Sequence, residues 1–360
     1  MIRDANPDRR WRRIFFGVAL AVAAYAVVAP LTSLDAAQAL NIPLLTDRLW
    51  FRIATITAMF IVMATAWNII GGLTGYAAFG NVAFFGIGAY TTGMLIAKAR
   101  WPFLVALPLA PVAAAVFAAL VGLPLLRLRG HYFAVASLGV GVAVGELVQN
   151  IDYHGQPVFG GATGLFLPIF SVPNRGLFFF YLMLGAAAVS IAVTWWVMRS
   201  RFGYGLIAIR ENEDAAEVIG VNTTAYKVAA YALAAALTGL AGGIFSQWNV
   251  FINQENSFPI EYNVQMILMA LVGGTGTVFG PAAGAVLLQL LIQFLAGSLP
   301  ITLDLPFLPS DARAVFAQIV LGLLLMLVVI FAPRGIIDFF GGRSRLSLAY
   351  LRRSLRETSI

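Results

Sequence analysis

The chain has 360 residues, of which 60% are hydrophobic and only 11% are charged, and its mean hydropathy is +0.86. Water-soluble domains usually carry roughly 25% charged residues, so this composition excludes an ordinary soluble domain and indicates a protein that crosses a membrane several times. The absence of cysteine excludes disulfides, thiolate metal sites and a cysteine nucleophile, and the formal charge of +7 matters less than where the charges lie.

The chain begins with a basic head, residues 1–13, and an apolar run that starts at Ile14. This run is longer than the roughly 7–15 apolar residues of a signal peptide, so we expect a retained first helix. Uncharged runs of about 18 or more residues, long enough to cross a bilayer, recur along the chain. The predicted fold is therefore all-α, a polytopic transmembrane bundle of about ten segments. The predicted segments cover residues 14–34, 53–73, 76–97, 102–126, 132–150, 177–198, 226–247, 263–274, 278–296 and 314–333.

The third and eighth segments are the least regular. Glycines and Asn81 crowd residues 73–88, and the joint at 273–280 reads GGTGTVFG. Each glycine weakens a helix by about 1 kcal/mol relative to alanine, so we leave open whether these two segments span fully. Both interruptions begin with GG followed by TG, which indicates a faint internal repeat.

Lysine and arginine are concentrated in three places, with five before Ile14, four within 199–227 and six after Ala332. Because cytoplasmic loops carry the excess of positive charge, both termini and the loop at 199–225 are predicted to be cytoplasmic. The predicted organisation is a cytoplasmic head (1–13), a transmembrane domain (14–333) and a cytoplasmic basic tail (334–360). Lys98 and Arg100 would lie outside, so either the third segment is re-entrant or this short loop is an exception.

One polar stretch interrupts the apolar chain, SRFGYGLIAIRENEDAAEVIGVN. It predicts a short helix over Gly205–Ile219 along the cytoplasmic face, with Gly220 as its C-cap. One face of this helix carries small side chains, and on another Arg210 is spaced to pair with Glu213 or Asp214. The residues alone leave two interpretations open, a solvated connector or a lever on which a partner protein docks.

Several motifs are missing. No GxxxxGK[ST] loop occurs, so the chain has no P-loop for nucleotide phosphates. An ion-coupled carrier needs ionisable groups at membrane depth, and Glu146 is the only acid well inside the predicted segments. A transporter of this composition would take its energy from another subunit. Gly141 and Gly145 form a GxxxG pair, which predicts close helix packing rather than a nucleotide site.

Five blocks of sequence resemble, in order, the branched-chain amino acid ABC transporter permeases of the LivM type. Their order in the chain matches the family over roughly residues 68–336. The blocks are NIIGGLTGYAAFGNVAFFGIGAY, LRLRGHYFAVASLG, RFGYGLIAIRENEDAAEVIGVNTTAYKVAAYALAAALTGLAGGIF, LVGGTGTVFGPAAGA and LGLLLMLVVIFAPRGI.

The resemblance implies the permease subunit of an ATP-driven importer in the bacterial inner membrane, which moves branched-chain amino acids and is not itself an enzyme. It implies no catalytic residue, metal or cofactor in this chain, with ATP and Mg on partner ABC ATPase subunits. The other implied partners are a second related permease, a periplasmic substrate-binding protein and membrane lipid, and no nucleic acid. The cytoplasmic helix would couple to the ATPase through Arg210, Glu211, Asn212, Glu213, Ala215, Ala216 and Gly220.

Interrupted helices often line transport paths, so the predicted substrate-path residues are Asn81, Phe84, Phe85 and Thr275. The chain departs from the family pattern at Val142, where an acid is usual, and at Asn81, where histidine is frequent. These departures leave the substrate open. An importer of urea or short amides and a stand-alone carrier or channel remain the alternatives.

Overall fold

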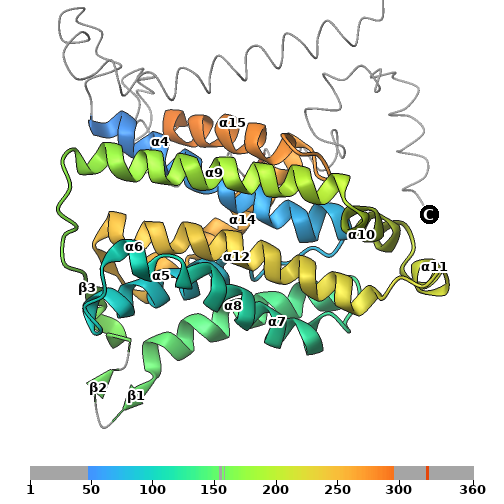
Figure 1. Ribbon diagram of the computed structural model, residues 1–360, viewed down its shortest axis with the longest axis horizontal. Coiled ribbons are helices and arrows are strands. Elements are labelled where there is room, and N and C mark those ends of the chain that lie inside the picture. Colours follow the sequence, from blue (N-terminus) through green and yellow to red (C-terminus); the bar gives the residue numbers. More distant parts are fainter. Residues whose placement is uncertain (1–47, 154–155, 158, 296–321, 324–360) are drawn as a thin grey trace, which may run out of the picture.

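The computed structural model describes residues 48–153, 156–157, 159–295 and 322–323, and shows a bundle of helices that run roughly side by side (Figure 1). The head, the tail and the first predicted segment lie outside the described residues, as does the tenth segment apart from 322–323. The helices are α4 (Arg48–Trp67), α5 (Val82–Ala97), α6 (Phe103–Ala106), α7 (Leu109–Leu125), α8 (His131–Asn150), α9 (Arg175–Arg199), α10 (Arg201–Glu211), α11 (Glu213–Val218), α12 (Thr223–Asn249), α13 (Gln254–Ser257), α14 (Ile260–Gly273) and α15 (Gly280–Leu295). A π-helical turn, η1 (Asn68–Gly72), extends α4, and a 3₁₀ turn, η2 (Gly161–Thr163), precedes the third strand.

Long apolar helices dominate, as predicted, and the all-α fold class is confirmed. In the described part of the chain, five helical stretches are long and apolar enough to cross a membrane. They are Phe51–Gly72, Phe103–Leu125, His131–Asn150, Arg175–Arg199 and Thr223–Asn249. Each of the other three predicted segments within the described residues is a shorter helix, namely α5, α14 and α15.

Helix α12 lies at the centre and packs against α7, α5, α4 and α9. Its contact with α5 is backbone to backbone, because glycines stand where the two helices meet. A Cβ added at Gly88 would overlap the Gly239 backbone oxygen, and one at Gly242 would overlap the Phe85 backbone oxygen. Small residues allow such close approach between membrane helices, where dispersion replaces the hydrophobic effect.

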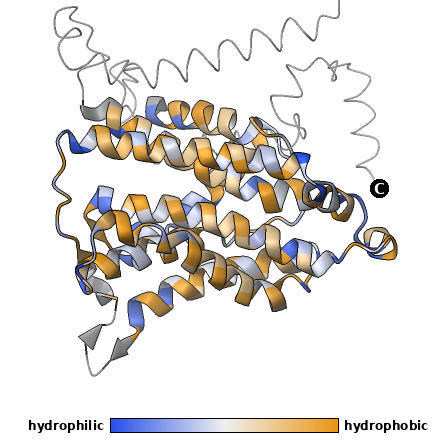
Figure 2. Ribbon diagram, in the orientation of Figure 1, coloured by the Kyte–Doolittle hydropathy of each residue, from blue (hydrophilic) through white to orange (hydrophobic). Residues whose placement is uncertain are grey.

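The outer surface of the bundle is itself apolar, and hydrophilic residues gather mainly near the ends of the helices (Figure 2). Large side chains such as Leu120 on α7, Val135 on α8 and Trp196 on α9 are between 63% and 70% exposed. Apolar surface of this extent marks contact with lipid or another apolar partner. The chain is accordingly a multi-pass membrane protein.

The two ends of the bundle differ. Two short antiparallel ribbons, β1 (Asp152–Tyr153) with β2 (Gln156–Pro157) and β3 (Leu165–Phe166) with β4 (Phe251–Ile252), lie at one end. Helices α10 and α11 lie at the other (Figure 1). The polar stretch singled out in the sequence therefore forms a structure of its own beyond the ends of α9 and α12.

Candidate functional site

The polar stretch forms two helices, α10 and α11, so the single helix predicted over Gly205–Ile219 is wrong. Asn212 divides them, because its backbone is extended, with φ −161° and ψ 112°. Its side-chain oxygen accepts a hydrogen bond from Ala215 N at 3.0 Å and so caps the start of α11. Glu213 and Asp214 then occupy the first turn, where the helix dipole favours negative charge.

Gly220 ends α11, as predicted. It adopts a left-handed backbone with φ +89°. Its N–H donates to Glu217 O and the N–H of Val221 donates to Ala216 O, both at 3.0 Å. This pair of bonds is a Schellman motif, which favours glycine at the left-handed position. Helix α11 is thus a short element with a defined start and a defined end.

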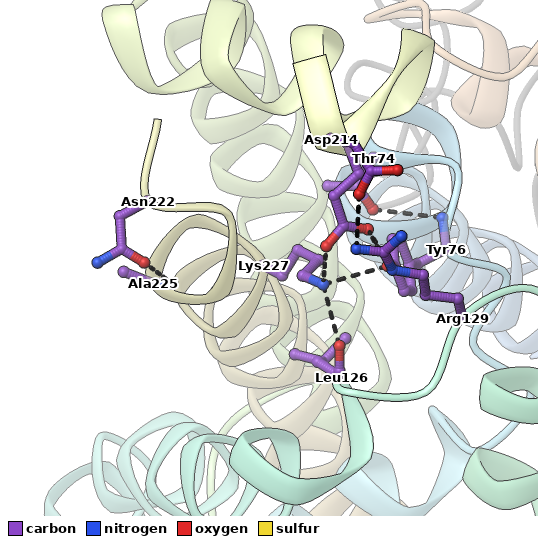
Figure 3. Close-up of polar contacts among 9 residues, drawn as sticks. Thr74, Tyr76, Leu126, Arg129, Asp214, Asn222, Ala225 and Lys227 are labelled. Carbon is purple, nitrogen blue, oxygen red and sulfur yellow. Dashed lines mark hydrogen bonds and ion pairs between the residues drawn. The ribbon is translucent and has the colours of Figure 1, made fainter. Parts of the chain in front are cut away.

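Glu213 ties α11 to the body of the bundle. Its carboxylate accepts hydrogen bonds from the Tyr76 hydroxyl and, at 2.6 Å, from Lys227 Nζ. Arg129 lies at 3.8 Å from the same carboxylate and pairs with Asp214 at 2.9 Å. Figure 3 shows that these groups converge from α11, α12, the segment before α5 and the loop between α7 and α8. The predicted pairing of Arg210 with Glu213 or Asp214 is therefore wrong, because Lys227 and Arg129 hold the two acids.

Lys227 lies inside this cluster, with a side chain only 4% exposed. Its ammonium donates three hydrogen bonds, to Glu213 Oε1 at 2.6 Å, to Leu126 O at 3.0 Å and to the Tyr76 hydroxyl at 3.1 Å. The three donors of the ammonium are thus all used, which is what a buried lysine requires. A buried charge with this many partners fixes the start of α12 relative to α11.

Charge and hydrogen bonding govern the acid at the centre of the cluster. Partial burial acts to raise the pKa of Glu213, but the hydrogen bonds from Lys227 and Tyr76 and the charges of Lys227 and Arg129 outweigh it and lower the pKa below its ordinary value. The pKa of the Arg129 guanidinium is raised, first by its hydrogen bond to Asp214 and then by the charge of Glu213. Both shifts favour the charged forms of Glu213 and Arg129 at neutral pH.

Arg210 ties α10 to the two glycine-rich interruptions. Its Nη1 donates to Gly72 O at 3.0 Å, while Nη2 pairs with the neighbouring Glu211 at 3.1 Å. A Cβ added at Gly75 would lie 3.0 Å from Arg210 Cγ, and one at Gly276 would lie 2.9 Å from Arg210 Nη1. The arginine thus occupies space that side chains at these two positions would fill.

The two interruptions also meet through Asn68, a buried residue at the start of the π-helical turn. Its Nδ2 donates to Thr277 O at 2.9 Å and its Oδ1 accepts from Gly276 N at 2.8 Å. Gly75 and Gly276, the last glycines of the two matching GG–TG sequences, have nearly the same left-handed φ, +75° and +74°. The similarity noticed in the sequence therefore corresponds to two adjacent segments with a shared turn conformation.

The outward face of α11 differs from the one expected. Ala216 is only 2% exposed and packs in the core, whereas Asp214, Ala215 and Glu217 are exposed. Two apolar residues are exposed as well, Val218 to 87% and Ile219 to 75%. Two neighbouring aliphatic side chains at the tip of a capped helix offer a contact surface that the sequence analysis did not assign.

Of the predicted path residues, Phe84 and Phe85 are buried in the core. Phe84 contacts the Tyr231 ring, with centroids 5.0 Å apart, and Phe85 contacts the Phe245 ring at 5.2 Å. Thr275 is half-buried in the second glycine-rich segment. Asn81 is fully buried, and both polar atoms of its side chain lack a hydrogen-bond partner within the described part of the chain. The assignment of these four residues to a substrate path stays a prediction.

A cavity of about 300 Å³ lies between α8 and the α13–α14 turn. Val82, the first residue of α5, lines it together with Gly141 and Gly145 of the GxxxG pair. These two glycines do allow the predicted close packing, because a Cβ at Gly141 would lie 3.2 Å from Gly80 Cα and one at Gly145 would lie 3.4 Å from Phe258 Cβ.

Sequence reasoning missed Tyr76, Arg129, Lys227 and Asn68 as partners of the polar elements. Lys227 carried a readable signal, since a lysine within an apolar helical run needs a counter-charge. The other three gave none, because their partners lie far away along the chain.

Comparison with known proteins agrees with this architecture. The family model described as branched-chain amino acid transport system / permease component matches residues 49–329. The high-affinity branched-chain amino acid transport system permease protein LivM of Salmonella typhimurium is 29% identical over 319 residues, which cover 82% of this chain and 71% of the relative. LivM of Escherichia coli K12 is 28% identical over the same shares, and a probable LivM of Methanocaldococcus jannaschii is 25% identical over 65% of this chain and 68% of its own length. The chain therefore belongs to the family of branched-chain amino acid transport system permeases.

Proposed function

We propose that this chain is the membrane-spanning subunit of an ATP-driven importer that carries branched-chain amino acids across the bacterial inner membrane. The relatives are permeases named for this transport, and the apolar bundle provides the spanning helices. The chain binds no nucleotide itself in this account, since it has no P-loop sequence. ATP and Mg are bound and used by ABC ATPase subunits on the cytoplasmic side.

The exposed tip of α11 is the observation that carries the proposal. Val218 and Ile219 lie beyond the spanning helices, next to the exposed acids Asp214 and Glu217. An apolar centre with a polar rim is the usual anatomy of a protein–protein contact. The ATPase subunit is the partner for this surface, and the helix ends at which it lies form the cytoplasmic side.

Arg210 and Glu213 transmit movement of the tip into the bundle. Arg210 bonds to Gly72 O and Glu213 to Lys227, so a displacement of α10 and α11 acts on η1 and on the start of α12. Both contacts reach residues beside the glycine-rich interruptions, where the helices are least regular. Nucleotide-driven movement of the ATPase is thereby coupled to the part of the bundle that can rearrange.

The complete transporter contains a second, related permease and a periplasmic binding protein that delivers substrate to the end of the bundle opposite α11. Both termini of this chain are then cytoplasmic, with 1–13 as the head and 334–360 as the tail. The orientation follows from the excess of arginine and lysine in these segments and in 199–225.

Association with the ATPase tests this function most simply. We expect Val218→Asp to reduce co-purification of the ATPase subunit about tenfold or more, because a charge would enter an apolar contact. Ile169→Asp is the matched control, since Ile169 is 70% exposed but follows β3, away from α11. The proposal fails if the unaltered chain transports leucine in vesicles without an ATPase, as a stand-alone carrier would.

A further inference from the structure

The cavity between α8 and the α13–α14 turn reaches into the bundle as far as Val82, where α5 begins, and Asn263 of α14. Both residues line the cavity, and both are only 2% exposed, so they form its inner end. Its lining also includes the exposed residues Glu255 and Glu261. Carboxylates in a membrane protein face water rather than lipid. The cavity is therefore hydrated on one side and closed on the other by the meeting of α5 and α14.

A hydrogen bond joins the two helices at this closed end, since Val82 N donates to Asn263 Oδ1 at 2.9 Å. We call this meeting of Val82 and Asn263 the α5–α14 contact. It is a small contact, because α14 packs mainly against α15 and α4, whereas α5 packs mainly against α12 and α7. The two helices can therefore separate here while each keeps its principal neighbours.

The chain that leads to Val82 is suited to movement. Residues 75–80 form neither helix nor strand, and the chain before them is held by Arg210, whose Nη1 donates to Gly72 O at 3.0 Å. A displacement of α10 therefore reaches the start of α5 through a segment that has no helical hydrogen bonds of its own to break.

This irregular segment rests on α8. Phe79 N donates to Ser137 Oγ at 2.9 Å, and a Cβ added at Gly80 would overlap Ser137 O. Helix α14, in contrast, holds the start of α5 through Asn263. The start of α5 can thus move away from α14 together with α8, with loss of the bond to Asn263.

Unpaired amide atoms lie at this contact. Within the described part of the chain, Asn81 Nδ2, Asn81 Oδ1 and Asn263 Nδ2 have no hydrogen-bond partner, and all three atoms are buried. Asn81 is the residue before Val82 and is itself fully buried. Buried amide groups in folded proteins are almost always paired, and an unpaired one is unfavourable. This conformation therefore carries a cost that is absent when water reaches the two asparagines.

We propose that the α5–α14 contact is a gate that opens in each transport cycle and brings the side chains of Asn81 and Asn263 into the water-filled path of the substrate. The unpaired amides favour the open conformation, because they gain hydrogen bonds there, whereas packing and the bond to Val82 N favour the closed one. A gate needs two conformations of similar free energy, which a small bias then interconverts. The inference rests on the proposed function and identifies which part of the path moves.

Thiol reactivity in different states is the first test, and the absence of cysteine from this chain removes its background. The complete transporter, with cysteine-free partner subunits, would carry a single thiol from Asn81→Cys or Val82→Cys. Lipid nanodiscs expose both of its faces to a methanethiosulfonate reagent. We expect the labelling rates of both variants to rise about tenfold or more from the resting transporter to the one hydrolysing ATP with L-leucine present, because the population shifts towards the open gate.

Two further variants calibrate this measurement. Thr92 of α5 is fully buried beside Gly243 of α12, so the thiol of Thr92→Cys should stay unreactive in both states. Val142 is 42% exposed and lines the cavity, so the thiol of Val142→Cys should react in both. The gate is overturned if the thiols of Asn81→Cys and Val82→Cys stay as protected as that of Thr92→Cys while ATP is hydrolysed, or react equally in the two states.

Stability against transport is the second test. Asn81→Leu keeps the approximate volume of the side chain but removes the unpaired amide. The thermal midpoint of the purified transporter should therefore stay unchanged or rise, while ATP-driven transport of L-leucine falls about tenfold or more, because the open gate loses its hydrogen bonds to water. Asn81→Ser keeps a polar group and should retain most of the transport.

Thr92→Val is the matched control, since the Thr92 hydroxyl is also buried without a partner but lies away from the α5–α14 contact. It should leave transport unchanged. A lower thermal midpoint for Asn81→Leu would show that the amide is bonded in the resting protein, and normal transport by this variant would show that the amide has no part in opening. Either result contradicts the proposal.

The two proposals fail differently. If ATP drives leucine transport while the thiols of Asn81→Cys and Val82→Cys stay protected, the importer stands and the gate is wrong. If these thiols become reactive when L-leucine is added and no ATPase associates with the chain, the gate stands and the proposed function is wrong.

Discussion

Lys227 Nζ lies 2.6 Å from Glu213 Oε1, and the two side chains are only 4% and 14% exposed. This contact joins α11, which projects from the bundle, to α12, which runs through its centre. Removing one partner of such a pair leaves the other charge buried and uncompensated, which costs far more than a surface ion pair contributes. The pair therefore determines where α11 sits.

Loss of this contact should destabilise the protein. We expect Glu213→Ala to lower the free energy of unfolding by roughly 3–5 kcal/mol, because Lys227 loses its counter-charge. Thermal inactivation of the purified transporter measures the effect, and Glu217→Ala, at an exposed position of the same helix, should be close to neutral. Adding Lys227→Met to Glu213→Ala should recover part of the loss. Equal effects of Glu213→Ala and Glu217→Ala would rule out the clamp.

The same contact predicts a dependence on pH. The folded pKa of Glu213 lies below its ordinary value of 4.5, so its stabilising contribution is complete above that pH and is lost as the pH falls from about 4.5 to the folded pKa. The difference in thermal midpoint between the unaltered protein and Glu213→Gln should therefore be constant near neutral pH and shrink in acid. If the difference in thermal midpoint instead grows as the pH falls, the carboxyl group of Glu213 is protonated in the folded state.

Asn212 should be replaceable only by other capping residues. Its side chain accepts from Ala215 N, and loss of such a cap typically costs about 0.5–2 kcal/mol. Asn212→Ala is expected to let α10 continue into α11, which would move Val218 and reduce ATP hydrolysis stimulated by the binding protein. Asn212→Asp and Asn212→Ser keep an acceptor and should retain most of the stimulation. If all three substitutions behave alike, the cap does not set the position of α11.

Gly276 should tolerate no side chain. Its φ of +74° costs a non-glycine residue roughly 1–2 kcal/mol, and a Cβ would lie 2.9 Å from Arg210 Nη1. Gly276→Ala is expected to lower both the thermal midpoint and transport. Gly139→Ala is the control, because Gly139 lies within α8 with open space where the Cβ would be. Normal transport by Gly276→Ala would contradict the role given to Arg210 as a link between the two interruptions.

How well the sequence predicts this structure depends on how far apart along the chain the interacting residues lie. The spanning helices are readable because uniform apolarity over about 20 residues is a local signal with one physical meaning in a membrane. The C-cap at Gly220 is local too and was predicted. The break at Asn212 was also readable, since asparagine followed by Glu213 and Asp214 is an N-cap pattern, but helical periodicity through the stretch obscured it.

The site depends on contacts that no local pattern encodes. Arg210 has acids three and four residues away, at the spacing of a helical pair, yet it bonds to Gly72 O, 138 residues distant. Glu213 lies on α11 but pairs with a lysine of the next helix. Once the chain breaks at Asn212, the predicted neighbours no longer share a face. The orientation of every side chain beyond that point then depends on tertiary packing, which explains why Ala216 is buried and Val218 exposed.

One measurement tests the central claim, that the tip of α11 is where the ATPase acts. A single cysteine introduced by Val218→Cys in this otherwise cysteine-free chain would be paired with cysteines along the cytoplasmic surface of the ATPase subunit, with Ile169→Cys as the control. The account predicts a specific cross-link from position 218, formed in the assembled transporter and altered in yield when ATP binds. The account would be contradicted if the cysteine at position 218 stayed fully reactive to thiol reagents in the assembled transporter and formed no cross-link.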